Sequence, residues 1–286
     1  MTMTREPEKR RLTSSLCSRR SASNSDVDRP ITVDTSCSSG LTAFRFRLAS
    51  LNTAVILAGG LGTRLQPLTN IVPKPLLPIG QSTVMDIQIL ALKKSGFDHV
   101  IIATNYMADY LESVIGDGQR YGVKVTVSRE PERLGTCGPL SLLRDQLVEP
   151  FLMMNGDILT SLDFAQLMAF ATQVEADLTV VTTEFTTPFR FGRVISEGHF
   201  ITAIEEKPDF KTEILAGIYG MKPGVLELIP DATYFGIDDL IKCMLETKRP
   251  IAKFVLKDYW ADIGQLPDYE LAKETYQIEQ ARHRRS

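Results

Sequence analysis

The stretch AVILAGGLGTRLQPLTNIVPKPLLPIG, residues 54–80, decides the fold of this chain. It begins with an apolar run, residues 54–58, which is typical of a strand buried on both faces of a parallel sheet. Three glycines follow within four residues: Gly59, Gly60 and Gly62. Glycine lets the backbone turn sharply, so that its N–H groups can face anionic oxygens. The stretch therefore predicts a strand that ends in a phosphate-binding turn.

Two cationic side chains follow the glycines. Arg64 supplies a planar guanidinium, and Lys74 lies between two prolines that restrict its backbone. Together they indicate a site for a triphosphate. A glycine-rich turn after a strand is also common as a purely structural feature. This one lacks the Lys-Ser/Thr pair of a Walker loop and the G-x-G-x-x-G spacing of a dinucleotide-binding fold.

Composition narrows the class of protein. The 286 residues allow one large domain or two modest ones, and no run approaches the ~18 apolar residues that a membrane span needs. The cysteines, at positions 17, 37, 137 and 243, form neither a metal-type pair nor a convincing disulfide framework. We therefore expect a protein of the reducing cytoplasm, with no membrane partner.

The first 50 residues differ from the rest. Residues 1–50 are rich in Ser, Thr and Arg and lack apolar periodicity, which predicts a disordered tail before one folded domain over residues 51–286. An organellar transit peptide should lack acidic residues, and this segment contains several. The tail is only weakly basic, so we expect no nucleic-acid partner.

From Ala54 onward, strand-like and helix-like segments alternate. This alternation predicts an α/β fold with a mostly parallel sheet and helices on both faces. We expect strands over residues 100–103, 123–127, 177–183 and 251–256, and helices over residues 82–94, 105–114, 224–229, 236–248 and 267–280. A hairpin should turn at residues 197–198.

A second glycine-containing turn, residues 134–140, leads into a helix expected to end at Leu147. Gly135 and Gly138 would let the backbone approach a flat ligand, and the first turn of a helix presents unpaired N–H groups. On composition alone, an ordinary helix start is the simpler interpretation.

Two acidic residues are candidates for metal binding. Asp157 follows the apolar run 151–154, at the carboxyl end of a predicted parallel strand, where such sheets bind ligands. It could equally cap the helix expected near Leu162. Asp262, in Trp-Ala-Asp-Ile-Gly at residues 260–264, supplies the second carboxylate that a hard cation would favour.

Residues 57–80, 135–140 and 205–208 resemble the motifs of the sugar-1-phosphate nucleotidyltransferase family. The match is most similar to mannose-1-phosphate and heptose-1-phosphate guanylyltransferases. The resemblance covers about residues 53–275 and implies a Rossmann-like, GT-A-like fold. Many relatives continue into a left-handed β-helix, which we do not expect here. The implied reaction joins a nucleoside triphosphate, with GTP favoured, to a sugar 1-phosphate, and it depends on Mg²⁺.

The resemblance also implies a role for each matching residue. The catalytic residues would be Arg64, Lys74 and Asp157. The nucleotide-binding residues would be Leu57, Ala58, Gly59, Gly60, Gly62, Thr63, Gly135, Thr136 and Gly138. The sugar-phosphate-binding residues would be Gly192, Glu206, Lys207 and Gly217. The metal ligands would be Asp157 and Asp262. Without the resemblance, a Glu-Glu-Lys run is typical of solvated surface.

The sequence departs from the family at two positions. Cys137 stands where alanine is usual, and Leu215 replaces an asparagine of the sugar site. The acceptor is therefore open among mannose, a heptose, an amino sugar and a cyclitol phosphate.

Several alternatives also stay open at this point. Thymidylyl, cytidylyl or uridylyl transfer would use the same phosphate-binding residues. The competing functions are a non-catalytic sugar-nucleotide sensor and a nicotinamide-dependent oxidoreductase. Such an oxidoreductase should have an acidic residue some distance after its glycines, and that residue is absent here. Whether the chain is a monomer or a homo-oligomer is not decided by the sequence.

Overall fold

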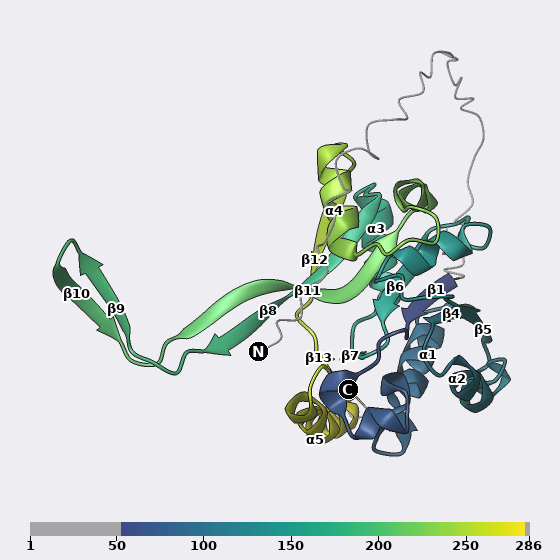
Figure 1. The fold of residues 1–286 in the computed structure, drawn as a ribbon, viewed down its shortest axis with the longest axis horizontal. Helices are drawn as coiled ribbons and strands as arrows, with labels where there is room; N and C mark the ends of the chain where they lie inside the picture. The colour runs from purple at the N-terminus through teal and green to yellow at the C-terminus, as the bar shows by residue number, and fades with distance from the viewer. Residues whose placement is uncertain (1–52, 284–286) are drawn as a thin grey trace, which may run out of the picture. The chain divides into compact units, whose positions relative to one another are not determined.

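The computed structural model describes residues 53–283, and the side chains through residue 276. Its centre is a seven-stranded sheet with the strand order β12-β8-β11-β6-β1-β4-β5 (Figure 1). In chain order these strands are β1 (Thr53–Leu57), β4 (His99–Thr104), β5 (Lys124–Arg129), β6 (Phe151–Asn155), β8 (Leu178–Pro188), β11 (Asp209–Met221) and β12 (Ile251–Val255). Only β11 runs antiparallel to its neighbours, so the prediction of a mostly parallel sheet is confirmed.

Helices cover both faces of the sheet, as the alternation predicts. The α-helices are α1 (Val84–Lys94), α2 (Ala108–Ile115), α3 (Phe164–Gln173), α4 (Ile237–Glu246) and α5 (Leu266–His283). One core joins β1 to α1, α2 and α3 through residues such as Ile56, Ile89 and Leu167. The other joins the opposite face to α4 through Val55, Leu240 and Met244. The side chains of β1 therefore alternate between two cores, which explains its continuous apolar run.

The start of α1 shows how the local sequence fixes an element. The Thr83 hydroxyl accepts a hydrogen bond from the Asp86 N–H (3.1 Å), and the Asp86 carboxylate accepts one from the Thr83 N–H (2.8 Å). This capping box satisfies N–H groups that have no partner within the helix. Residues 82–83 form the short strand β3 (Ser82–Thr83), paired with β2 (Pro78–Ile79). The helix therefore begins two residues later than predicted.

Two predicted helices are short 3₁₀ segments instead. The segment after the second glycine turn is η5 (Gly138–Leu143), and the helix predicted over 224–229 is η6 (Pro223–Leu228). Each has a proline in its first turn, and the Ser141 hydroxyl bonds the carbonyl of Gly138 (2.7 Å), which competes with regular helix bonding. The remaining 3₁₀ segments are η1 (Thr63–Leu65), η2 (Leu68–Asn70), η3 (Lys74–Leu76) and η4 (Gln119–Tyr121).

Strand β8 is longer than the strand predicted over residues 177–183, and the sequence pattern predicts no strand for the segment that forms β11. Their pairing extends from Asp209, opposite Pro188, to Met221, opposite Leu178. Both strands continue together beyond the rest of the sheet (Figure 1). At their end lies the predicted hairpin, formed by β9 (Arg193–Glu197) and β10 (Phe200–Glu205). Every residue from 184 to 213 except Pro208 is exposed. We call residues 184–213 the arm.

A second small sheet lies near the glycine turn. It pairs β7 (Ile158–Thr160) with β13 (Trp260–Asp262), and Ile263 and Leu159 pack in a third apolar cluster with α5. None of the helices within residues 53–283 is long and apolar enough to cross a membrane. The predicted tail, its boundary with the folded domain and two of the cysteines, at positions 17 and 37, lie outside the described residues.

Candidate functional site

A cleft of about 530 Å³ opens at the carboxyl ends of β1 and β6. Carboxyl ends of parallel strands are where open α/β sheets bind ligands. Of the residues predicted to form the site, the following line this cleft: Leu57, Ala58, Gly59, Gly60, Gly62, Thr63, Arg64, Lys74, Gly135, Thr136 and Asp157. The glycine turn, the second glycine-containing turn and the first acid, which are separate in the sequence, thus share one cavity.

The glycines of the first turn are required at two positions. Gly62 has a φ of +61°, and a Cβ there would lie 2.8 Å from a methyl of Thr69. The Thr69 hydroxyl bonds the carbonyl of Gly62 (2.8 Å), which fixes this conformation. A Cβ on Gly59 would lie 2.9 Å from a carboxylate oxygen of Glu130. Side chains at these positions would therefore displace the walls of the cleft.

The two predicted acidic ligands lie beside each other. Asp157 follows β6, and Asp262 ends β13, whose pairing with β7 places Asp262 opposite Ile158. The N–H of Ile263 donates to the carbonyl of Asp157 (3.0 Å). Burial first, and then the Asp157 carboxylate, raise the pKa of Asp262 to about 6, while Lys74 and Arg64 oppose this rise. The charges of Asp157, Lys74 and Arg64 therefore all act on Asp262.

Lys74 points toward this acidic pair. Its ammonium donates to one carboxylate oxygen of Asp157, in a contact that is largely shielded from solvent. The other carboxylate oxygen of Asp157 is buried and has no hydrogen-bond partner. A buried carboxylate oxygen without a partner is costly, so it favours a ligand at this point. A divalent cation suits a pair of carboxylates, one of which presents a free oxygen.

The cleft also contains a residue that sequence reasoning missed. Glu130 is only 8% exposed and lines the cleft. One of its oxygens accepts a hydrogen bond from the N–H of Leu134 (3.2 Å), and the other faces Gly59. Burial raises the pKa of Glu130, although the Leu134 N–H opposes this. Its position directly after β5, at the same edge of the sheet as Asp157, was the available signal.

Hydrogen bonds to residues 233–237 fix the position of the second glycine-containing turn. The N–H groups of Cys137 and Gly138 donate to the carbonyl of Phe235 (2.9 and 3.0 Å), and the Ile237 N–H donates to the Thr136 hydroxyl (2.7 Å). Gly138 is buried beneath this segment and does not line the cleft. Cys137 is fully buried in the core, as expected of a small apolar residue. Both residues therefore support the turn from within.

The structure does not bring the predicted sugar-phosphate residues to the cleft. Three of them are exposed on the arm: Gly192, Glu206 and Lys207. The Lys207 ammonium lies 3.8 Å from a carboxylate oxygen of Glu206. Gly217 lies in β11 with a φ of +72°, and a Cβ there would meet the amide of Asn155 at 2.7 Å. Their predicted contact with a sugar phosphate remains a prediction.

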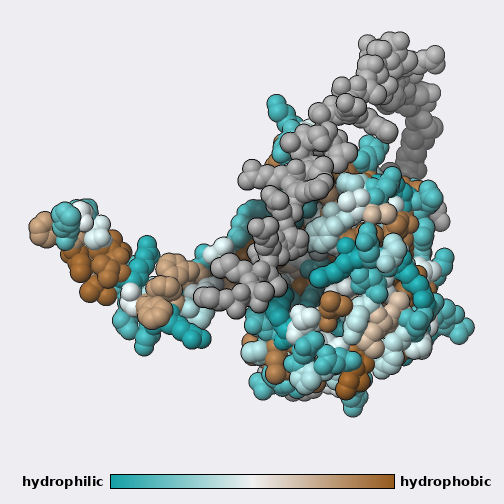
Figure 2. Space-filling model, viewed as in Figure 1, coloured by the Kyte–Doolittle hydropathy of each residue, from teal (hydrophilic) through white to brown (hydrophobic). Residues whose placement is uncertain are grey.

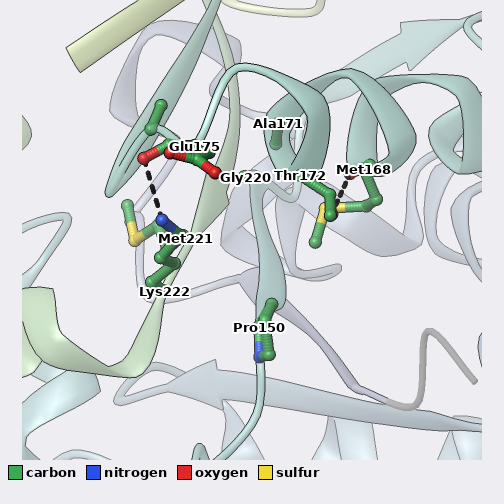
Figure 3. A pocket seen from close by; sticks show the side chains of 9 residues that line it. Pro150, Met168, Ala171, Thr172, Glu175, Gly220, Met221 and Lys222 are labelled. Atoms are coloured by element: carbon green, nitrogen blue, oxygen red, sulfur yellow. Dashed lines mark hydrogen bonds between the residues drawn. The ribbon is translucent and has the colours of Figure 1, made fainter. Parts of the chain in front are cut away.

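A second hollow, of about 370 Å³, lies between α3 and β11 and is lined by none of the predicted residues (Figure 3). Its floor is apolar, with Met168 and Ala171 beside Gly220. At its rim, Lys222 donates to the carbonyl of Glu175 (2.9 Å). Its described lining includes no acid pair and no glycine turn, so the cleft at β1 is the candidate site.

Comparison with known proteins identifies the relatives of this chain. A family model described as Nucleotidyl transferase matches residues 53–279. The probable mannose-1-phosphate guanylyltransferase 1 of Oryza sativa subsp. japonica is 36% identical over 225 residues, which are 76% of this chain and 62% of that protein. The mannose-1-phosphate guanylyltransferase catalytic subunit beta of Danio rerio is 37% identical over 224 residues, with the same shares. The chain thus spans less than two thirds of these relatives.

A solved structure has a similar fold. HddC from Yersinia pseudotuberculosis complexed with GMP-PN superposes with a TM-score of 0.62 at 27% identity, covering 79% of this chain and 99% of that one. These findings confirm the family resemblance and the fold predicted from the sequence motifs.

Proposed function

Because the chain belongs to the nucleotidyl transferase family, we propose that it is an enzyme that joins a nucleoside triphosphate to a sugar 1-phosphate. The products are a nucleoside-diphosphate sugar and pyrophosphate. Both relatives named above carry the name mannose-1-phosphate guanylyltransferase, one of them as a probable one, and the similar solved structure is complexed with GMP-PN. GTP is therefore the proposed donor.

In the proposed reaction, an oxygen of the sugar 1-phosphate attacks the α-phosphorus of the triphosphate. A new P–O bond forms as the bond between the α-phosphorus and the oxygen bridging to the β-phosphate breaks, and its electron pair leaves with pyrophosphate. The attacking oxygen is already ionised, so no general base is needed. The main obstacles are repulsion between two anions and the charge that develops on the leaving oxygens.

The cationic side chains of the cleft address both obstacles. Arg64 lines the cleft beside the glycine turn, and Lys74 is held by its contact with Asp157. We assign Arg64 to the departing pyrophosphate and Lys74 to the phosphates of the donor. Preorganised charges of this kind stabilise a transition state by roughly 10²–10³-fold each. The backbone N–H groups of the glycine turn would complete the phosphate site.

The acidic pair is the proposed site of Mg²⁺. Asp157 presents a buried oxygen with no hydrogen-bond partner, and its charge raises the pKa of the neighbouring Asp262. Within residues 53–283, no cluster of three or more acidic, His or Cys side chains is placed to hold a metal. The other ligands would be substrate phosphates and water, as is usual for Mg²⁺. When bound, the cation would neutralise phosphate charge and help orient the substrates.

Glu130 is the residue that we propose selects guanine. Guanine presents N–H donors on its Watson–Crick edge, and an ionised carboxylate accepts hydrogen bonds without donating any. The Glu130 oxygen that faces Gly59 is available for this purpose. Transfer of a thymidylyl, cytidylyl or uridylyl group is the alternative, because the phosphate-binding residues would serve any base.

The sugar end of the site is a proposal that rests on the motif match. Glu206 and Lys207 would contact the sugar hydroxyls and phosphate, with Gly192 and Gly217 allowing close approach. Because the first three lie on the arm, the arm would have to take another position to reach the cleft. Leu215 is 45% exposed at the base of the arm, where the family has asparagine. The acceptor therefore stays open among mannose, a heptose, an amino sugar and a cyclitol phosphate.

The observation that carries the proposal is that Arg64, Lys74 and Asp157 line one glycine-lined cleft, and that the charges of all three shift the pKa of the neighbouring Asp262. To test it, the full chain is given each of the four common triphosphates with each of a set of sugar 1-phosphates and Mg²⁺, and pyrophosphate is measured. We expect release with GTP and at least one sugar 1-phosphate. No release from any pair contradicts the proposal, and binding of a nucleotide sugar without turnover would favour the sensor.

The location of the protein and the bounds of its catalytic domain are also proposed from the sequence. We propose a cytoplasmic location, which cell fractionation tests. We also propose that residues 51–286 form the catalytic domain. Removal of residues 1–50 should therefore leave turnover unchanged. Limited proteolysis followed by the pyrophosphate assay tests this boundary.

A further inference from the structure

The arm exposes many large apolar side chains. They are Phe185, Phe189, Phe191, Val194, Ile195, Phe200, Ile201, Ile204 and Phe210. Figure 2 shows apolar residues gathered at the end of the arm. Contiguous exposed apolar surface on a water-soluble fold marks an interaction site.

Both faces of the β9–β10 hairpin at the end of the arm carry exposed apolar side chains. Ile204 pairs with Val194, and Ile201 pairs with Ser196. Residues directly opposite each other point to the same face, so Val194, Ile201 and Ile204 share one face. They are 54%, 63% and 66% exposed. The other face carries Ile195 and Phe200 together with the Arg193–Glu205 ion pair, whose N–O distance is 3.2 Å.

The hairpin is anchored at its root. The rings of Phe189 and Phe191 lie edge to face with centroids 5.8 Å apart, and those of Phe189 and Phe210 lie 5.6 Å apart. The Arg193 guanidinium lies 5.5 Å from the centroid of the Phe210 ring. These contacts hold the hairpin in a defined direction relative to the strands of the arm.

Only one edge of the hairpin is shaped for pairing. A two-stranded hairpin is marginally stable by itself, and additional strands stabilise it. The β10 edge is interrupted by a bulge between Ile201 and Ala203, which is a common protection against further pairing. β9 contains neither proline nor a bulge. The open edge is therefore β9.

The charges of β9 make this edge complementary to itself. Arg193 and Glu197 lie at equal distances on either side of Ile195. If two β9 strands pair antiparallel about Ile195, each Arg193 lies opposite Glu197 of the other copy. Opposite charges across a pair stabilise it, and like charges destabilise it.

We propose that two copies of this chain form a dimer by antiparallel pairing of their β9 edges, centred on Ile195. The interface is symmetric, because the same edge is used by both copies. The result is a four-stranded sheet, with Val194, Ile201 and Ile204 of both copies on one continuous face. This inference does not depend on the reaction proposed above.

Sedimentation equilibrium of the full chain tests the dimer with charge variants. The wild type is expected at twice the chain mass. Glu197→Arg would place two arginines opposite each other at both ends of the paired edge, and Arg193→Glu would place two glutamates there. Each variant alone should dimerise roughly tenfold more weakly or worse. Mixed together, the two variants regain complementary pairs, and dimers of near wild-type affinity should return.

The controls separate this interface from any other. Glu227→Arg, an equal change of charge on an exposed residue outside the arm, should leave the dimer unchanged. A monomeric wild type overturns the proposal. So does a dimer that tolerates Glu197→Arg, or two variants whose mixture stays as weak as each alone.

Discussion

Asp262 lies beside Asp157 because the pairing of β13 with β7 places it opposite Ile158. The Ile263 N–H also donates to the carbonyl of Asp157 (3.0 Å). Two carboxylates in a partly buried cleft repel each other, and burial together with Asp157 raises the pKa of Asp262 to about 6. The chain thus maintains an arrangement that is unfavourable without a cation, which is typical of functional sites.

Replacing Arg64 should slow turnover without unfolding the protein. Arg64 lines the cleft beside the glycine turn, so Arg64→Ala removes one preorganised cation. We expect pyrophosphate release to fall by ~10²-fold, with an unchanged melting temperature. The matched control is Arg129→Ala, which removes a guanidinium that pairs with Asp109 and Glu112 on the surface. Activity of Arg64→Ala within twofold of the wild type would remove Arg64 from the site.

Replacing Glu130 should change the preference for the base. Glu130→Gln keeps the shape of the side chain but replaces a carboxylate oxygen by an amide that donates. A hydrogen bond to a charged group contributes about 1.5–3 kcal/mol. The ratio kcat/KM for GTP should therefore fall by roughly 10- to 100-fold, while the values for the other triphosphates change much less. An equal loss for all four triphosphates would show that Glu130 supports the turn rather than selecting guanine.

Gly62 should be more sensitive to substitution than its neighbour Gly60. Gly62→Ala puts a Cβ at a φ of +61° and 2.8 Å from Thr69, whereas a Cβ on Gly60 meets nothing within 4 Å. We expect Gly62→Ala to lower the free energy of unfolding by about 1–3 kcal/mol. Gly60→Ala should leave it within about 1 kcal/mol of wild type. Urea denaturation measures both, and equal effects would contradict the described turn.

The start of α1 should weaken as the pH falls. Burial would raise the pKa of Asp86, but hydrogen bonds from Tyr121 and Thr83 and the charge of Arg120 outweigh it and lower that pKa. A lowered pKa contributes stability that is present above the unfolded-state value and is lost as the pH falls through the folded-state value. Melting temperatures of wild type and Asp86→Asn should therefore differ most near pH 7 and converge only as the pH falls below the ordinary value of 3.8. A constant difference would contradict this role.

Local sequence was enough to predict the centre of the fold. The apolar run of β1 and the glycines that follow it are adjacent in the chain, so their strand-and-turn conformation depends on near neighbours. The same holds for the hairpin around Gly198. The β1 run is continuous because its side chains enter two different cores, on the two faces of the sheet.

Features that depend on distant contacts were not predictable from spacing. The proximity of Asp262 to Asp157 depends on β13 pairing with β7, and spacing along the chain did not indicate that pairing. Glu130 belongs to no recognised motif. Its place in the cleft is visible only in the folded chain, where the absence of a side chain on Gly59 leaves room for its carboxylate. The extension of β8 into the arm was missed because its exposed residues have no core to impose an apolar pattern.

The most direct test of the central claim is a double-mutant cycle on the acidic pair. Pyrophosphate release from GTP and the preferred sugar 1-phosphate is measured for Asp157→Asn, Asp262→Asn and the double variant across a range of Mg²⁺. If both carboxylates hold one cation, the double variant should lose no more than about threefold beyond the worse single variant. Losses that multiply, with an unchanged dependence on Mg²⁺, would show that the two acids act separately and would contradict the account.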